Sequence, residues 1–153
     1  MAIPFVIGLI FLGLPGVYLE VRNSRNGESY FLRRSRRGTR VTLSWVHSVE
    51  RSPWVEHYEV VNHRFALREV NVKSFGSGVD PVAPVTRTSD GWVTMSEMQR
   101  DFPSLRFIHS PAVNRRLVID GDELDLAERI PPYSPVEVCV RSAPKFLTWM
   151  IKA

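Results

Sequence analysis

The chain has 153 residues, of which 44% are hydrophobic and 24% are charged, with a formal net charge of +4 and a single cysteine. This length suits one domain and excludes a two-domain enzyme or a multi-pass transporter, while the balanced composition excludes wholesale disorder. One cysteine excludes an internal disulfide, a thiolate-rich zinc site and a cysteine-ligated iron–sulfur cluster.

Residues 2–19 (AIPFVIGLIFLGLPGVYL) form an apolar segment without a charged side chain. As a helix it would measure ~27 Å, just short of the ~30 Å hydrocarbon core of a bilayer. A cleaved secretion signal needs a basic residue before the apolar run and a small-x-small site after it, and this segment has neither. We therefore predict an uncleaved N-terminal transmembrane or signal-anchor helix in residues 1–19, which contacts the cell membrane through residues 2–19 in a single pass.

A basic juxtamembrane segment follows at residues 20–40, where seven arginines against two glutamates give a local charge of +5. The pattern favours a first hairpin whose tip joins Tyr30–Leu32 to Val41–Leu43. Beside an anchor, the same arginines could instead bind anionic lipid head groups. The candidate lipid contacts are Arg33, Arg34, Arg36 and Arg37. No aromatic platform or recognition-helix pattern interleaves with them, so we expect no nucleic-acid partner.

Residues 41–153 show the period-two alternation that is typical of β-strands. The alternating runs lie within residues 41–45, 54–60, 65–72, 105–108, 117–119, 124–126 and 136–140. A phase slip inside residues 65–72 predicts a β-bulge, and Asp120-Gly121 predicts a tight hairpin turn. A short helix is expected at residues 96–102, with Ser96 as its N-cap. The predicted fold class is mainly β, an antiparallel sandwich or barrel of about eight short strands.

The most informative cluster lies in residues 45–56 (WVHSVERSPWVE). By alternation, His47 shares the inward face with Trp45, and Glu56 shares it with Trp54 and Tyr58. If the two strands pair across residues 51–53, an imidazole and a carboxylate face the apolar side near one end. Burial of either group alone is costly, and a hydrogen-bonded pair offsets much of that cost.

Three roles are open for His47, Glu56 and the neighbouring Glu50. They could bind a divalent cation, with His47 and Glu56 as the candidate ligands, or they could bind the amine of a ligand. The spacing favours a third role, a structural pair that fixes the strand register. Ser48 forms no catalytic dyad with His47, because neighbours on a strand point to opposite faces.

Two blocks of sequence in this region resemble one family. The first comprises residues 47–50 (HSVE), residues 52–56 (SPWVE) and Tyr58, and the second comprises residues 74–78 (SFGSG) with Pro81. Their order and spacing, over about residues 43–81, resemble a bacterial and archaeal family known as a domain of unknown function (number eighteen-fifty). Ser77 stands where that family usually has the alanine of a Phe-Gly-Ala-Gly stretch.

The resemblance implies a small β-rich protein with an amino-terminal apolar segment, encoded beside TRAP transporters of the TAXI type. It therefore implies an extracytoplasmic body with TRAP transporter subunits as partners, and it carries over no catalytic residue. The positive-inside rule points the other way, because arginines follow the predicted anchor and none precedes it. The candidate ligand or partner site consists of His47, Ser48, Glu50, Glu56, Tyr58, Gly76 and Gly78.

Three functions from different classes follow. The first, which we favour, is a membrane-anchored accessory or binding component of TRAP-type solute transport. The second is a metal-dependent or acid–base enzyme that uses His47, Glu50 and Glu56. The third is a structural membrane-surface protein whose arginines bind anionic lipid. We expect no cofactor.

Overall fold

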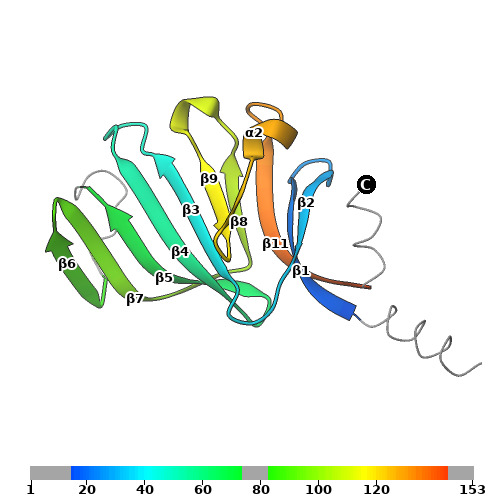
Figure 1. Cartoon of the computed structure of the whole chain (residues 1–153), viewed down its shortest axis with the longest axis horizontal. Coiled ribbons are helices and arrows are strands. Elements are labelled where there is room, and N and C mark those ends of the chain that lie inside the picture. The colour runs from blue at the N-terminus through cyan, green and yellow to red at the C-terminus, as the bar shows by residue number, and fades with distance from the viewer. Residues whose placement is uncertain (1–14, 74–82, 145–153) are drawn as a thin grey trace, which may run out of the picture.

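The computed structural model describes residues 15–73 and 83–144, which form two antiparallel β-sheets (Figure 1). The four-stranded sheet has the order β2 (Ser29–Arg34), β1 (Pro15–Asn23), β11 (Pro135–Pro144) and β8 (Ser104–Ile108). The seven-stranded sheet has the order β10 (Asp122–Leu124), β9 (Arg116–Ile119), β3 (Arg40–Val46), β4 (Pro53–Val61), β5 (Arg64–Val72), β7 (Trp92–Phe102) and β6 (Val85–Ser89). The chain is therefore mainly β and antiparallel, as predicted, although the described residues hold eleven strands rather than about eight.

One hydrophobic core joins the two sheets, because both contribute inward side chains to the same buried cluster. Leu19 in β1 and Val138 in β11 are fully buried on the side of the smaller sheet, as are Val41 in β3 and Leu117 in β9 on the side of the larger one. Removal of this apolar surface from water is the main force that holds the sheets together. The alternation predicted at residues 41–45 and 136–140 is thus confirmed.

The structure corrects the end of the predicted anchor. Pro15–Leu19 lie in strand β1, where they pair antiparallel with the end of β11, Leu19 opposite Val140. Leu19 and Val21 alternate into the core, so this stretch is apolar because it is a core strand and not because it continues a helix. No helix among the described residues is long and apolar enough to cross a membrane. The rest of the predicted anchor, residues 1–14, lies outside them.

The first hairpin also differs from the prediction. It joins β1 to β2, whereas β3 belongs to the other sheet, so Tyr30–Leu32 do not pair with Val41–Leu43. Arg33 and Arg34 therefore end β2, Arg36 and Arg37 lie where the chain crosses to the other sheet, and all four are exposed. The backbone N–H of Ser35 donates to the carbonyl of Val17 (2.8 Å), which holds this crossover beside the start of β1.

Residues 96–102 form the second half of β7 and not the predicted helix. Glu97 adopts a positive φ of 58°, and the pairing of β7 with β5 shifts between Leu67 and Glu69. This irregularity lets Met95 and Met98, three residues apart, both enter the core. A spacing of three is typical of a helix, which is why alternation missed this strand.

Two local predictions are confirmed. The pairing of β5 shifts within residues 65–72, where a bulge was predicted. Asp120 and Gly121 connect β9 to β10 with φ values of 49° and 95°, as a two-residue type I′ turn requires. Two short helical segments that alternation did not reveal are the 3₁₀ turn η1 (Pro111–Val113) and the helix α2 (Leu126–Arg129).

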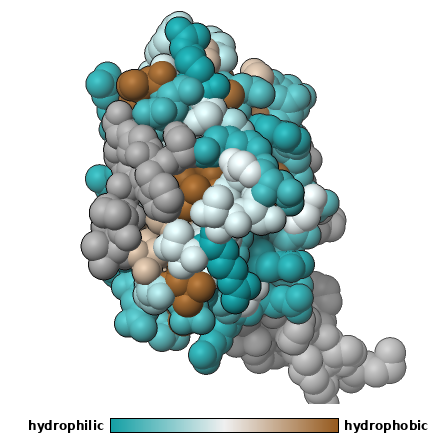
Figure 2. Space-filling view, turned by 90° about the vertical axis from the view of Figure 1, so that its left-hand side faces the viewer, coloured by the Kyte–Doolittle hydropathy of each residue, from teal (hydrophilic) through white to brown (hydrophobic). Residues whose placement is uncertain are grey.

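The end of the molecule that carries β6 is largely hydrophilic (Figure 2). Its described apolar residues form separate small spots, and residues 86–89 of β6 are exposed and polar. A polar edge strand of this kind discourages pairing with another sheet. A pocket that could bind a ligand lies instead between the two sheets.

Candidate functional site

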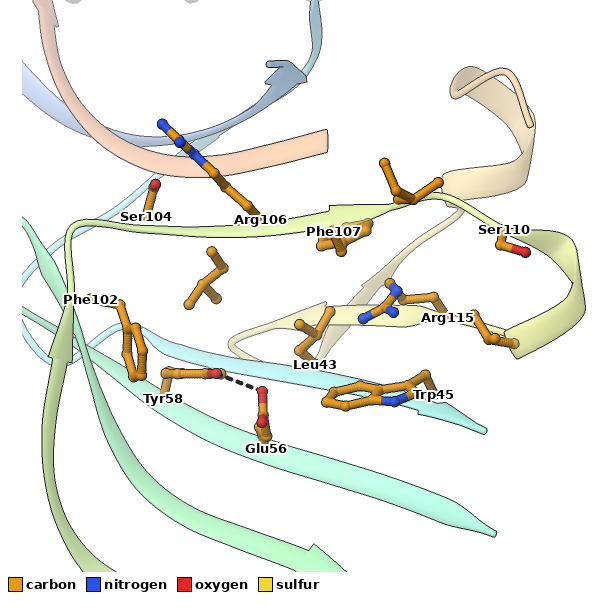
Figure 3. Close-up of a pocket in the computed structure, with 13 residues that line it drawn as sticks. Leu43, Trp45, Glu56, Tyr58, Phe102, Ser104, Arg106, Phe107, Ser110 and Arg115 are labelled. Carbon is orange, nitrogen blue, oxygen red and sulfur yellow. Dashed lines mark hydrogen bonds between the residues drawn. The ribbon is translucent and has the colours of Figure 1, made fainter. Parts of the chain in front are cut away.

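A pocket of about 530 Å³ opens between the inner face of the larger sheet and strand β8 (Figure 3). Strands β3 and β4 form one wall, and β8 with the loop that contains η1 forms the other. Its lining includes Leu43, Trp45, Glu56, Leu105, Phe107 and Arg115. Mainly apolar walls with a few convergent polar groups, at this volume, are the usual form of a small-molecule site.

Glu56 places a carboxylate on the apolar face of the larger sheet, opposite Leu43 of β3 and Val70 of β5. Its Oε2 accepts a hydrogen bond from the Tyr58 hydroxyl (2.6 Å), and its Oε1 accepts one from the Trp54 indole Nε1–H (3.1 Å). Burial raises the pKa of Tyr58 above its ordinary value, and the charge of Glu56 raises it further. The phenol therefore stays protonated and keeps donating to the carboxylate at physiological pH.

Arg115 brings a positive charge into the pocket from the residue before β9. Its guanidinium carbon lies 4.8 Å from the centroid of the Trp45 ring and 4.7 Å from that of Phe107, so the group is held between two aromatic rings (Figure 3). Burial lowers the pKa of Arg115, and the charge of Glu56 partly offsets that effect. A guanidinium still remains charged at physiological pH, because its pKa starts above about 12. The site thus holds an aromatic-clamped cation.

Aromatic rings continue this stack along the β3–β4 hairpin. Trp45 and Trp54 are direct cross-strand partners, with ring centroids 5.6 Å apart and an interplanar angle of 21°. His47 stacks on the same Trp54 at 5.5 Å. Stacked rings resist rotation. The stack of Trp45, Trp54 and His47 therefore fixes the Trp45 face that contacts Arg115 and the Trp54 N–H that donates to Glu56.

His109 lies at the end of β8, close to Arg115, and is almost fully buried. Burial lowers the pKa of its imidazole, and the charge of Arg115 lowers it further. The ring is therefore neutral at physiological pH and adds no charge beside Arg115. Its Nδ1 is buried and has no hydrogen-bond partner within the described ranges.

An ion-pair network on the opposite face of the smaller sheet fixes the position of β8. Glu137 of β11 accepts from Arg22 of β1 through Nε and Nη2 (3.0 and 2.7 Å), and from Arg106 of β8 through Nε and Nη2 (2.9 and 2.8 Å). Burial alone would raise the pKa of Glu137, but these hydrogen bonds outweigh it and lower the pKa to about 2. Because Arg106 precedes Phe107, the network also positions one wall of the pocket.

The predicted site residues fall into separate groups. Glu56 and Tyr58 line the pocket and are hydrogen-bonded to each other. His47 lies at the β3–β4 turn, where its Nδ1 accepts from the backbone N–H of Glu50 (3.3 Å), and Ser48 is exposed in the same turn. Trp54 separates His47 from Glu56, because it stacks on the first and donates to the second.

The remaining site predictions concern two glycines and a metal site. Gly76 and Gly78 lie outside the described residues. Within residues 15–73 and 83–144, no group of three or more His, Cys, Asp or Glu side chains could hold a metal ion.

Sequence reasoning missed Arg115 and Phe107. Strand alternation could have found Arg115, because residues 115, 117 and 119 share a face of the strand and both Leu117 and Ile119 are core residues. An arginine on the same strand face as two core residues indicates a partly buried cation that needs a partner. Phe107 was visible as part of an alternating run but carried no sign of its contact with Arg115.

Comparison with known proteins gives one family. A family model described as a domain of unknown function (DUF1850) matches residues 41–126, which cover β3 to the start of α2 and include Glu56, Phe107 and Arg115. Neither the curated proteins nor the solved structures contain a match to the chain.

Proposed function

The chain belongs to the DUF1850 family, and from that membership together with the pocket we propose that it is a binding protein rather than an enzyme. In this proposal the pocket between the sheets takes a small organic ligand. The protein acts as a membrane-anchored, extracytoplasmic accessory component of TRAP-type solute transport.

The pocket itself is the observation that carries the binding role. Its volume of about 530 Å³ falls within the ~300–1,000 Å³ that ligand sites usually occupy. Leu43, Leu105 and Phe107 supply apolar contact area, while Glu56 and Arg115 supply fixed charges that could orient a ligand. Such a combination gives affinity through burial and selectivity through a few polar groups.

An enzyme that uses His47, Glu50 and Glu56 is supported less well by the contacts. Acid–base catalysis needs a group within hydrogen-bond reach of its proton partner. Both oxygens of Glu56 already accept from Trp54 and Tyr58, and the His47 ring is stacked against Trp54 at the outer end of the hairpin. These contacts favour a structural role for Glu56 and His47, in which they hold the hairpin in place, over a role in proton transfer.

The membrane-anchored part of the proposal is supported by the position of the arginines. Residues 33–37 lie beside the start of β1, because Arg34 pairs with Tyr18 and Ser35 donates to Val17. The apolar residues 2–14 precede that point directly in the chain. Basic side chains beside an anchor contribute ~1 kcal/mol each near an anionic bilayer surface. The link to TRAP transporter subunits and the extracytoplasmic position are supported by the family resemblance alone.

A thermal-shift screen tests the binding role. The full chain, purified in a mild detergent, is screened against small carboxylates, amines and neutral compounds. We expect at least one compound to raise the midpoint of unfolding, because a ligand that binds only the folded state stabilises it. Val113→Trp fills the pocket from the η1 loop and should abolish the shift. Val118→Trp is the matched control, because Val118 alternates with the core residues of β9 and faces away from the pocket. Absence of any shift in the wild type, or equal shifts in Val113→Trp, would contradict the binding role.

Co-purification from native membranes tests the transport role. We expect TRAP transporter subunits to be recovered with the affinity-tagged chain after mild solubilisation, and the tagged chain to be recovered with a tagged subunit. Failure in both directions would remove the transport role and leave the binding role to the thermal-shift screen.

A further inference from the structure

We propose that the pocket recognises the carboxylate of a small organic acid through Arg115, whose guanidinium is clamped between Trp45 and Phe107. This inference rests on the proposed binding role and names the class of ligand. The apolar body of the acid would lie against Leu43 and Leu105, toward the interior of the pocket.

The first step is that Arg115 is charged and has no ion-pair partner among the described residues, although the charge of Glu56 acts on it from nearby. Its Nε has no solvent exposure and no hydrogen-bond partner in the part of the chain that the structure describes. No ion pair within 4 Å involves its guanidinium there either, in contrast to the arginines that bind Glu137 and Glu123. Arg115 is half-buried, so desolvation of its charge without such a partner carries a cost, and an anionic ligand would supply the missing interaction.

The second step is the direction in which Arg115 can bind. Aromatic rings lie on two sides of the guanidinium, with centroids 4.8 Å (Trp45) and 4.7 Å (Phe107) from its carbon. Hydrogen bonds can then form only in the guanidinium plane, whose nitrogens point into the pocket between the two rings (Figure 3). A planar carboxylate accepts two parallel N–H bonds in that geometry.

The third step is that two neighbouring polar groups bear on the choice between an acid and an amine, because Ser110 can donate to a ligand and Glu56 already has two donors from the protein. Each oxygen of Glu56 already accepts a hydrogen bond, from Trp54 and from Tyr58. Ser110 lines the pocket near Arg115, and its oxygen accepts from the backbone N–H of Ala112 (3.3 Å), which leaves its hydroxyl proton for a ligand oxygen. Beside Arg115 the pocket therefore offers a ligand oxygen the guanidinium N–H groups and the Ser110 hydroxyl proton, while each Glu56 oxygen keeps one further lone pair for a donor.

Three matched probes test the proposal on the wild-type chain. Phenylacetate, phenylacetamide and phenethylamine share a benzyl body and carry an anionic, a neutral and a cationic terminal group, respectively. Their dissociation constants are measured by ligand-observed NMR with the full chain in a mild detergent. We expect phenylacetate to bind at least tenfold more tightly than the amide, because charge-assisted bidentate bonds are about twice as strong as neutral ones. The amine is expected to bind more weakly still.

Two variants locate the interaction. Arg115→Gln should weaken phenylacetate binding at least tenfold and leave phenylacetamide binding nearly unchanged. Arg116→Gln removes the same charge one residue along the chain, but Arg116 is exposed and paired with Glu123, so it should leave both probes unaffected. Circular dichroism confirms that each variant is folded. If Arg115→Gln does not fold, the three-probe comparison on the wild type decides by itself.

The outcomes separate this inference from the binding role on which it rests. Tighter binding of phenethylamine, or equal binding of all three probes, would overturn recognition of a carboxylate while the binding role stands. Equal weakening by Arg115→Gln and Arg116→Gln would overturn the assignment to Arg115. Binding of none of the probes would overturn the inference as well, and the thermal-shift screen would then decide the binding role independently.

Discussion

Replacement of Glu137 by glutamine should destabilise the protein strongly at neutral pH and hardly at all at low pH. The side chain of Glu137 is only 6% exposed and holds β1 and β8 to β11 through Arg22 and Arg106. Its pKa of about 2, against an ordinary value of 4.5, corresponds to about 3 kcal/mol of folding free energy at neutral pH. Because Arg106 is largely exposed, solvent screening makes this an upper figure.

The sign of the pH dependence follows from the lowered pKa. The stabilisation by Glu137 is complete above the pKa of the unfolded state, near 4.5, and is lost as the pH falls toward about 2. Urea unfolding, monitored by tryptophan fluorescence, is measured for wild type and Glu137→Gln between pH 7 and pH 2. The difference in unfolding free energy should be on the order of 2–3 kcal/mol at pH 7 and should shrink across that interval.

Glu59→Gln is the control for this experiment. Glu59 pairs with Arg68 at 2.9 Å, but both side chains are partly exposed, so loss of this pair should cost less than about 1 kcal/mol. Equal costs for the two variants at pH 7, or a Glu137→Gln cost that persists unchanged at pH 2, would refute the reasoning from burial and pairing.

Three further predictions concern single side chains. Leu117→Ala should lower the free energy of unfolding, measured by urea titration, by about 2–5 kcal/mol, because Leu117 is fully buried in the shared core. A loss below about 1 kcal/mol would contradict that placement. The absorbance at 295 nm, which reports ionised tyrosine, should rise equally in wild type and Tyr58→Phe when the pH is raised to 11, because burial beside Glu56 keeps the Tyr58 phenol protonated. A smaller rise in the variant would show that Tyr58 ionises. Cys139 should react slowly with iodoacetamide in the folded chain and rapidly in urea, because burial raises the pKa of its thiol, and fast native alkylation would contradict this.

Local patterns predicted the strands that form the pocket wall. Alternation was enough to place Glu56 on the inward face with Trp54 and Tyr58. The chain turns at residues 47–52 rather than at the predicted residues 51–53, and it is this turn that pairs Trp45 with Trp54. The same reasoning predicted the bulge in β5 and the Asp120-Gly121 turn. These features depend on neighbours within about ten residues, where the backbone period decides which side chains share a face.

The rest depends on contacts between distant parts of the chain. Nothing near Pro15–Leu19 reveals that this apolar stretch pairs with the end of β11, more than a hundred residues later. In the same way, the contact of Arg115 with both Trp45 and Phe107 joins three segments that no periodicity connects. Pairing between distant segments depends on how all of the apolar side chains pack together in the core. The local sequence pattern therefore could not predict it.

The most direct test of the binding account is where a carboxylate probe lies on the protein. Nuclear Overhauser effects are measured between the aromatic protons of phenylacetate and the isotope-labelled full chain. We expect contacts from these aromatic protons to the methyl groups of Leu43 and Leu105, against which the aryl body lies, and we expect these contacts to be lost in Val113→Trp. Contacts only to residues outside the pocket, or contacts unchanged in Val113→Trp, would contradict the binding account.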